Sequence, residues 1–226
     1  MNDKERVAKH AASLVKDGMV VGLGTGSTAD FFIKELANRR KKERLQITTV
    51  ASSVVSMIKD QELGLPLMAI EHLTRLDLYV DGADEVAPDN TLLKGQGADL
   101  VREKLLARAS DQFIVLVDQS KMVDRIGARF AIPVEVMPIA WQLVRQQLEG
   151  LGGKGELRQN NNGNGLAVSS YGSLILDVVF GSDQDSAEID AILNEMPGVV
   201  EHGIFLGLAG SVLLVVDGEL KELPGK

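Results

Sequence analysis

The fold is first signalled by residues 19–28, which read MVVGLGTGST. An apolar run of strand length passes through closely spaced glycines into a segment of helical period. A glycine-rich turn at a helix N-terminus offers free backbone N–H groups and the positive end of the helix dipole to an anion. This segment predicts a parallel α/β sheet with a phosphate-binding turn. The alternative at this point is a tight turn without a ligand, in which Ser27 is the N-cap of the helix.

The turn differs from two well-known nucleotide-binding motifs. The dinucleotide fingerprint G-x-G-x-x-G would need a glycine where Ser27 stands, and the next expected strand ends in Ala51-Ser52-Ser53. That strand would need an Asp or Glu to bind the ribose of a dinucleotide. The Gly-Lys-Ser/Thr triplet of a P-loop is also missing from the turn. The pattern therefore argues against NAD and against a P-loop.

Apolar runs of strand length alternate with helical segments through residues 1–125, as is typical of a parallel α/β sheet. We expect strands at 19–23, 45–50, 67–70, 76–80 and 113–117, and helices that begin near Asp3, Ser27, Ser53 and Gln96. After Ile132 the expected order is strand 134–137, helix 140–148, two strands around the Asn/Gly turn 160–165, helix 186–196 and strand 199–205. The run 212–216 should return to the first sheet as a further strand.

The order of the second part is that of a β-α-β-β-α-β unit. The expected fold class is therefore α/β, with a Rossmann-like, mostly parallel sheet, helices on both of its faces, and a small α+β ferredoxin-like domain. We expect residues 1–130 and 206–226 to form the Rossmann-like catalytic domain. Residues 131–205 should form the ferredoxin-like domain.

Composition excludes several classes of function. The 226 residues carry 24 Lys and Arg against 32 Asp and Glu, a net charge of −8, which argues against a nucleic-acid partner. The absence of cysteine excludes disulfides, thiol nucleophiles and thiolate metal sites, and it fits a reducing compartment. The segment 1–9 does not resemble a signal peptide, and no apolar run approaches the ~20 residues that span a bilayer. We expect a cytoplasmic protein that does not bind membranes.

Two further motifs place polar side chains near the ends of expected strands. Asp81-Gly82-Ala83-Asp84-Glu85 follows the strand 76–80, at the edge where open α/β sheets bind ligands. Its carboxylates suit acid and base groups of an active site or the ligands of a divalent cation, and a solvated turn is the third alternative. Lys94-Gly95-Gln96-Gly97-Ala98 comes shortly afterwards and again leads into a helix. We expect it to face the same crevice, with its lysine opposing developing negative charge.

Glu103 is the candidate base. In the expected helix it lies beside Leu100, Leu106 and Ala107, an apolar stripe that suits a carboxylate to act as a base. Most single helical glutamates are surface charges, so only the neighbouring motifs favour a catalytic role. The three histidines, His10, His72 and His202, lack the spacing of a metal site or of a catalytic triad.

Taken together, these motifs resemble the A-type ribose-5-phosphate isomerase family. The stretches that carry the resemblance are GTGST at 24–28, DGADE at 81–85, KGQGA at 94–98, REK at 102–104, Ser120-Lys121, PVEV at 133–136 with Pro138, and PGVV at 197–200. They follow the family's order and spacing over nearly the whole chain. One departure is visible at Gln96, where many relatives have a third glycine.

The resemblance implies that the chain interconverts ribose 5-phosphate and ribulose 5-phosphate in the pentose phosphate pathway, without a metal or an organic cofactor. It implies that Glu103 is the proton acceptor. The substrate site that it implies consists of Thr25, Gly26, Ser27, Thr28, Asp81, Gly82, Ala83, Asp84, Lys94, Gly95, Gln96, Gly97 and Lys121. Isomerisation passes through a cis-enediolate, so we assign Lys94 to its oxygen and Asp81 with Asp84 to ring opening and hydroxyl protons. Lys4 or Lys121 should contact the phosphate, and a homodimer or homotetramer is expected.

Three other functions are compatible with parts of this pattern. A sugar-phosphate-sensing domain without activity could share the scaffold, but it would normally be joined to a DNA-binding module, for which the chain has no basic segment. An acyl-CoA transferase would use a nucleophilic glutamate and form a covalent intermediate. A metal-dependent phosphosugar enzyme would use the carboxylates of residues 81–85 as ligands.

Overall fold

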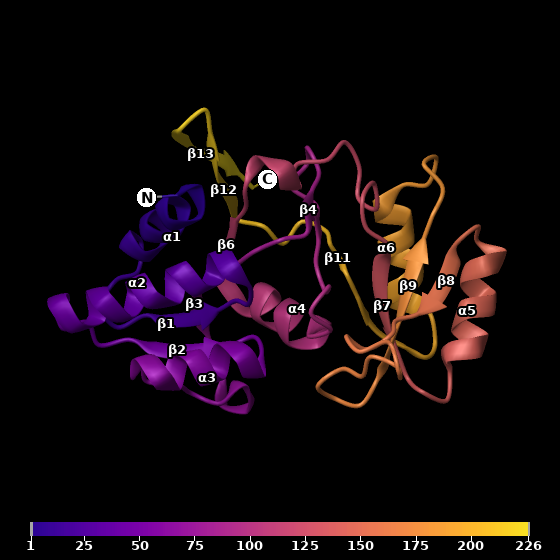
Figure 1. Ribbon diagram of the computed structural model, residues 1–226, viewed down its shortest axis with the longest axis horizontal. Coiled ribbons are helices and arrows are strands. Elements are labelled where there is room, and N and C mark those ends of the chain that lie inside the picture. The colour runs from indigo at the N-terminus through magenta and orange to yellow at the C-terminus, as the bar shows by residue number, and fades with distance from the viewer. Residues whose placement is uncertain (1, 226) are drawn as a thin grey trace. The chain divides into compact units, whose positions relative to one another are not determined.

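The computed structural model describes residues 2–225, which form two compact units (Figure 1). The first unit comprises Met1–Ala83, Arg102–Met122 and Gly207–Lys226, and the second comprises Asp84–Val101 and Val123–Leu206. Within the described residues, no helix is both long and apolar enough to cross a membrane. The domain limits expected from the sequence, 1–130 with 206–226 and 131–205, stay a prediction.

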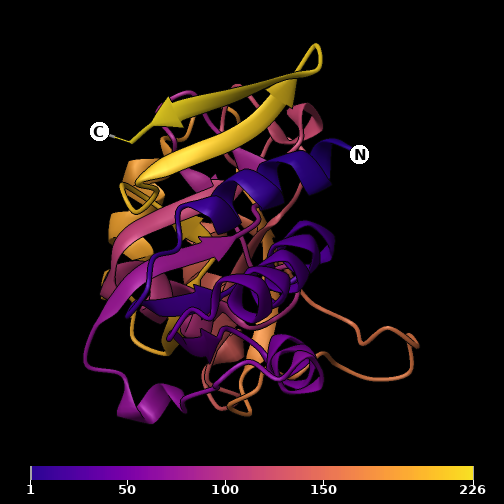
Figure 2. The same cartoon turned by 90° about the vertical axis from the view of Figure 1, so that its left-hand side faces the viewer.

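A six-stranded sheet in the order β13-β12-β6-β3-β1-β2 forms the centre of the first unit. Its strands are β1 (Val20–Leu23), β2 (Thr48–Ala51), β3 (Leu76–Asp81), β6 (Ser110–Leu116), β12 (Ser211–Val216) and β13 (Glu219–Pro224). All neighbouring pairs are parallel except β12 with β13, which form the yellow hairpin in Figures 1 and 2. The expected return of 212–216 to this sheet is confirmed, whereas the C-terminal strand of the hairpin was not foreseen.

Four helices accompany the sheet: α1 (Asp3–Ser13), α2 (Ser27–Glu43), α3 (Val54–Leu63) and α4 (Leu100–Ala109). Figure 2 shows α1 and α2 side by side, and their buried side chains, such as Phe32 and Leu36, pack with Leu78 and Val80 of β3. An ion pair joins α3 to α2, so α3 lies on the same face as α2. The connection from β3 through α4 to β6 runs across the sheet in the opposite direction, so its right-handed sense places α4 on the other face. A mostly parallel sheet with helices on both faces is therefore confirmed.

Two local expectations for the first part of the chain are wrong. Residues 67–70 are not a strand, because the chain makes only a single bridge from Leu67 to Thr49 and then turns through a 3₁₀ helix, η1 (Ile70–His72), on its way to β3. The helix expected from Gln96 begins at Leu100. Gly95 and Ala98 have φ values of 96° and 62°, and such left-handed residues hold the preceding segment in a turn.

The second unit contains a ferredoxin-like sheet in the order β10-β7-β9-β8. Its elements follow the chain order β7 (Ile132–Val136), α5 (Trp141–Gly150), β8 (Lys154–Leu157), β9 (Leu174–Val179), α6 (Ser186–Glu195) and β10 (Val199–His202). The β-α-β-β-α-β arrangement is confirmed, and the Asn/Gly turn is closed by a hydrogen bond from Asn160 N to the Gly165 carbonyl. Apolar residues on both helices, including Leu148 and Leu193, pack against the sheet.

A second sheet in this unit, in the order β11-β5-β4, was not predicted. It joins β4 (Glu85–Val86), β5 (Leu92–Leu93) and β11 (Ile204–Phe205). The expected strand 199–205 is divided at Gly203, where the backbone bonds to Pro133 on one side and to Lys94 on the other. Strands of two residues are too short to show a period in the sequence.

Glu135 is a buried carboxyl group within the four-stranded sheet. It is 1% exposed, its Oε1 accepts a hydrogen bond from Ser169 Oγ at 2.6 Å, and its Oε2 has no hydrogen-bond partner among residues 2–225. Burial raises the pKa of Glu135, and the charges of Glu201, which lies opposite on β10, and Asp99 add to the rise. Hydrogen bonds from Ser169 and Ser173 oppose the rise in pKa without cancelling it. The charged form of Glu135 therefore destabilises the folded chain.

Replacing Glu135 with Gln should stabilise the protein in a pH-dependent way. The folded-state pKa of Glu135 lies above the ordinary value of 4.5. The stability that the neutral carboxyl group contributes is therefore fully present below pH 4.5, and it is lost as the pH rises through the folded-state pKa. We expect the variant to gain about 1 kcal/mol at pH 8, or about 2–4 °C in melting temperature, and little at pH 4. Thermal melts at both pH values measure this. The control is Glu156→Gln, whose side chain is 84% exposed; an equal gain at both pH values would contradict the prediction.

Candidate active site

The carboxyl ends of β1 and β3 meet at the point where the strand order of the first sheet reverses. From β1 the chain goes outward to β2 and then returns to β3 on the other side of β1. Open α/β sheets bind ligands at such a switch point. Gly24 follows β1 there, and a Cβ on Gly24 would lie 2.6 Å from the Cα of Asp81, the last residue of β3. The glycine is required because the two strand ends approach so closely.

Asp81 is held at both of its carboxylate oxygens. Its Oδ1 accepts hydrogen bonds from the backbone N–H groups of Thr25, at 3.0 Å, and Gly82, at 2.7 Å. Its Oδ2 accepts the hydroxyl proton of Tyr79 at 2.5 Å. The residue is only 1% exposed. The structure thus brings the glycine turn and the first aspartate of DGADE into direct contact.

Glu103 lies in the first turn of α4 and is 6% exposed, so it is not one of the common surface glutamates. The charge of Glu103 acts on the phenol of Tyr79, as the charge of Asp81 does. Burial is the main cause that raises the pKa of Tyr79 well above its ordinary value, and the charges of Asp81 and Glu103 raise it further. The charges of two buried carboxylates therefore act on one buried phenol in the first unit.

The N-terminus of α2 supplies the features of an anion site. Its N-cap is Gly26, with φ of 103°, and no described side chain caps it. The alternative prediction, Ser27 as the N-cap, is therefore wrong. Ser27 is exposed, and its Oγ accepts a hydrogen bond from Lys4 Nζ at 2.9 Å. A cation, a hydroxyl group and the positive end of a 17-residue helix lie together here.

Lys121 belongs to the same unit. It is the last residue of η2 (Gln119–Lys121), the 3₁₀ turn that follows β6, the strand paired with β3. Lys121 thus follows the carboxyl end of β6, and Asp81 is the last residue of the neighbouring β3. Of the expected site residues, the first unit holds Thr25, Gly26, Ser27, Thr28, Asp81, Gly82, Ala83, Glu103 and Lys121.

The other expected site residues, Asp84, Lys94, Gly95, Gln96 and Gly97, belong to the second unit. Lys94 is 4% exposed, and its ammonium group lies 5.8 Å from the centre of the Phe205 ring. Its backbone N–H donates to the Gly203 carbonyl. A lysine held away from water has a stronger electrostatic effect than one on the surface.

The loop after Lys94 is held by an arginine that sequence reasoning missed. Arg158 Nη1 donates to the carbonyl oxygens of Gly95 and Gln96, at 2.9 and 3.0 Å, while its Nε donates to Asp177. Asp84 Oδ2 accepts the backbone N–H of Gln96 at 3.4 Å. Two glycines in the sequence indicate a turn, but nothing in the local sequence connects it with an arginine more than sixty residues away.

The third carboxylate of DGADE has a structural role. Glu85 is fully buried, and its carboxylate accepts backbone N–H groups of Gly127, Arg129 and Phe130 at 2.6–2.9 Å. It therefore anchors the loop at 127–130. Among residues 2–225, no three His, Asp or Glu side chains are grouped as the ligands of a metal ion would be.

Comparison with known proteins shows the family of this chain. The family model for ribose 5-phosphate isomerase A (phosphoriboisomerase A) matches residues 48–218. This chain belongs to the ribose 5-phosphate isomerase A family. Among curated members, ribose-5-phosphate isomerase A of Synechococcus sp. (strain ATCC 27144) is 46% identical, covering 96% of this chain and 94% of the relative. The protein from Thermosynechococcus vestitus is 43% identical, covering 96% and 93%.

Solved structures of the family have the same fold. Ribose 5-phosphate isomerase A from Methanocaldococcus jannaschii has a TM-score of 0.92 and 39% identity, covering 98% of this chain and 97% of its own. A D-ribose-5-phosphate isomerase in complex with phospho-erythronic acid has a TM-score of 0.94 and 36% identity, covering 99% and 100%. A second family model, the DeoR C terminal sensor domain, matches residues 1–70.

In this family member, a cluster of hydroxyl groups lies behind the glycine turn. Thr25 Oγ1 lies within 2.6–3.1 Å of the hydroxyl oxygens of Ser52, Ser53 and Ser56, and Ser56 donates to the Gly24 carbonyl. The hydroxyl of Thr25 is thus engaged with the protein. Ser52 and Ser53 follow β2, the neighbour of β1, so their position after a parallel strand could have indicated this contact.

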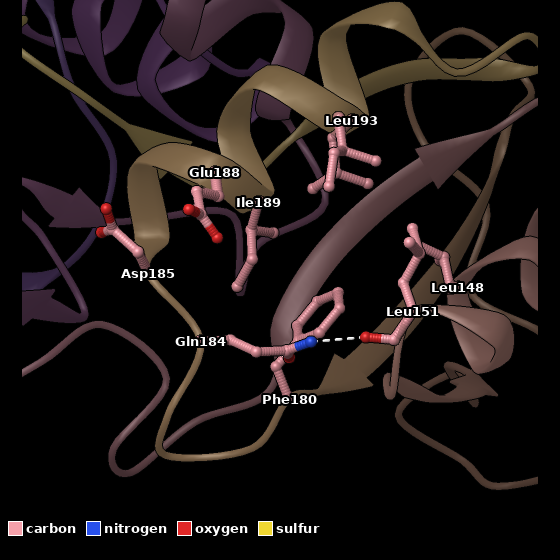
Figure 3. Close-up of a pocket in the computed structure, with 9 residues that line it drawn as sticks. Leu148, Leu151, Phe180, Gln184, Asp185, Glu188, Ile189 and Leu193 are labelled. Carbon is pink, nitrogen blue, oxygen red and sulfur yellow. Dashed lines mark hydrogen bonds between the residues drawn. The ribbon is translucent and has the colours of Figure 1, made fainter.

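A cavity of about 200 Å³ lies elsewhere in the isomerase chain, within the second unit. Figure 3 shows its lining, in which Gln184 donates a hydrogen bond to the Leu151 carbonyl and Phe180, Ile189 and Leu193 contribute apolar surface. Asp185 and Glu188 are its charged residues, and none of its nine described lining residues is basic. Acidic groups repel a phosphate, so this cavity does not suit a sugar phosphate.

Proposed function

We propose that this chain interconverts D-ribose 5-phosphate and D-ribulose 5-phosphate through a cis-enediolate, with Glu103 as the proton acceptor. Membership of the family and the names of its curated members support the reaction. The ligand of one related structure, phospho-erythronic acid, belongs to the same class of phosphorylated sugar derivatives. The observation that carries the proposal is that two buried carboxylates, Asp81 and Glu103, act on the same phenol, Tyr79. Asp81 also accepts a backbone N–H group of the glycine turn that leads into α2.

The chemistry requires a base and an electrophile. Moving a hydrogen between C2 and C1 means removing a carbon-bound proton and stabilising the negative charge that develops on oxygen. Glu103 takes the proton from C2 of the aldose and returns it to C1. Lys94 stabilises the enediolate oxygen, and Asp81 with Asp84 handles ring opening and the hydroxyl protons. All of these transfers use groups of the chain itself, without a metal or an organic cofactor.

The phosphate binds at the N-terminus of α2 in this proposal. A chain with a net charge of −8 must concentrate positive potential locally to hold a dianion. The backbone N–H groups at Gly26, Ser27 and Thr28 supply part of this potential, and Lys4 and Lys121 supply the rest. Gly82, Ala83 and the Gly95–Gly97 turn complete the contacts to the sugar.

Replacing Lys121 with Ala should weaken binding more than catalysis, because a phosphate contact acts equally on substrate and transition state. We expect KM for ribose 5-phosphate to rise about 5- to 50-fold, while kcat changes less than about 3-fold. Steady-state kinetics measure both. Lys42→Ala removes the same charge near the opposite end of α2 and should leave KM unchanged. An unchanged KM in Lys121→Ala would exclude the phosphate contact.

The function is tested by incubating the purified protein with ribose 5-phosphate in heavy water. We expect ribulose 5-phosphate to form, with solvent deuterium appearing at the carbons that exchange the proton. The match of residues 1–70 to a sensor domain favours one rival function, a sugar-phosphate sensor, which would bind the compound without turnover. An acyl-CoA transferase would instead leave a covalent adduct on a glutamate, which mass spectrometry detects.

We also propose that the chain acts in the cytoplasm as a homodimer or homotetramer. The location follows from the substrate, since a sugar phosphate dianion crosses a bilayer too slowly to leave the compartment in which it forms. Exposed apolar side chains such as Ile139 and Leu143, at 88% and 64% exposure, support self-association.

A further inference from the structure

Tyr79 is a buried phenol that the scheme above leaves unused. It lies two residues before Asp81 in β3, so both side chains leave the strand on the same face. Its ring is fully buried and stacks on Phe113, with 4.7 Å between the ring centroids. Gly22 on the neighbouring β1 makes room for it, because a Cβ there would lie 2.6 Å from Tyr79 Cδ2. The fold therefore fixes the ring from both sides.

The hydroxyl group of Tyr79 links two polar groups. It donates to Asp81 Oδ2 at 2.5 Å and takes part in a hydrogen bond with the hydroxyl of Ser52. Burial and the nearby carboxylates raise the pKa of Tyr79 well above its ordinary value, so the phenol keeps its proton throughout the working range of an enzyme. Tyr79 is thus a permanent donor to Asp81.

The hydrogen bond from Tyr79 to Asp81 comes from a side chain, so a substitution can remove it. The Oδ1 atom is held by backbone N–H groups of Thr25 and Gly82, which any side-chain substitution leaves in place. The Oδ2 atom accepts the Tyr79 proton, and Tyr79→Phe removes this hydrogen bond. A hydrogen bond to an ionised group is among the stronger ones in proteins, and a carboxylate that loses it gains rotational freedom.

We propose that Tyr79 is a positioning residue whose hydroxyl group orients Asp81 for opening of the sugar ring, while proton transfer at carbon by Glu103 does not depend on it. The inference rests on the proposed function and adds a residue to it. In ring opening, Asp81 takes the proton of the C1 hydroxyl group. The C1–O4 bond breaks with its electron pair going to O4, which takes a proton from water. The hydroxide that remains takes the proton from Asp81, so the balance is closed.

The two steps can be measured separately because ribulose 5-phosphate has no ring form. The C5 hydroxyl group, which would close a ring on the C2 ketone, carries the phosphate. Exchange of its C1 proton with heavy water therefore needs enediolate formation but no ring chemistry. For Tyr79→Phe we expect the conversion of ribose 5-phosphate to fall about 10- to 100-fold. The rate of C1 exchange in ribulose 5-phosphate should change less than about 3-fold, so the ratio of exchange to conversion rises.

Three variants separate the hydroxyl group from other effects. Phe113→Leu removes the ring stack but keeps the hydroxyl, so the melting temperature should fall while the ratio of exchange to conversion stays at the wild-type value. Tyr171→Phe makes the same chemical change at the second tyrosine of the chain, which is 52% exposed, and should change neither rate. Ser52→Ala removes the second partner of the phenol and should raise the ratio in the same direction, by less.

The proposal is overturned if Tyr79→Phe retains full conversion, or if conversion and exchange fall by the same factor. Should Tyr79→Phe fail to fold, an unchanged ratio in Ser52→Ala overturns it and a raised ratio supports it. A wild-type protein that neither converts nor exchanges would instead refute the isomerase function itself. The two failures are therefore distinguishable.

Discussion

Glu103→Gln should lower kcat for ribose 5-phosphate by at least about 10²- to 10⁴-fold, which is the usual contribution of a general base. The amide has nearly the volume of the carboxylate, so the buried position in the first turn of α4 is kept. What is lost is the capacity to accept a carbon-bound proton. Binding of the sugar phosphate should be nearly intact, because the proposed phosphate site is at the N-terminus of α2.

Two measurements check this prediction. The first is kcat together with the affinity for phospho-erythronic acid, a non-isomerisable probe, determined by calorimetry. The second is C1 exchange in ribulose 5-phosphate, which should be lost in Glu103→Gln although Tyr79→Phe retains it. Glu62→Gln, an exposed glutamate of α3, is the matched control and should keep the wild-type kcat. Wild-type turnover in Glu103→Gln would reject the assignment of the base.

Lys94→Ala should lower kcat about 10²- to 10³-fold, by comparison with the removal of a donor that stabilises a developing oxyanion. The ammonium group is buried against Phe205, so little water is present to take over its role. Because the truncation also leaves a cavity, Lys94→Met serves as a second variant that keeps most of the volume and removes only the charge. We expect a loss of similar size in both variants.

The control for Lys94 is Lys34→Ala. Lys34 also places its ammonium group over an aromatic ring, at 5.9 Å from the centre of Phe31, but it is exposed on α2. Its removal should leave kcat unchanged. If Lys94→Met retains most of the wild-type kcat while Lys94→Ala does not, the effect of Lys94 comes from packing, and its role at the enediolate oxygen is wrong.

Much of the fold could be predicted because its signals are local. The apolar run before Gly24, the alternating strand that leads to Asp81 and the helical stripe beside Glu103 each lie within one element, where the period of apolar residues indicates the structure. The ferredoxin-like order was read from the same kind of signal. The segment 67–70 misled because an apolar run of four residues fits a strand as well as a connection.

The site was predictable only in part. Asp81 and Glu85 belong to one motif, and nothing in their spacing distinguishes the carboxylate that contacts the glycine turn from the one that anchors a distant loop. The difference depends on which backbone N–H groups each carboxylate meets. Those groups belong to residues 25 and 129, which only folding brings into contact with the motif.

The amino-acid order alone determined the strand and helix pattern, the glycine turn, the excess of acidic residues and the motifs of the family. The tertiary structure decided that the Tyr79 hydroxyl donates to Asp81, that the Thr25 hydroxyl contacts three serines and that Lys94 packs on Phe205. The physical reason is the separation along the chain over which each kind of interaction acts. Periodicity acts between residues a few positions apart, whereas the pairing of a buried polar group depends on elements that meet only in the folded chain.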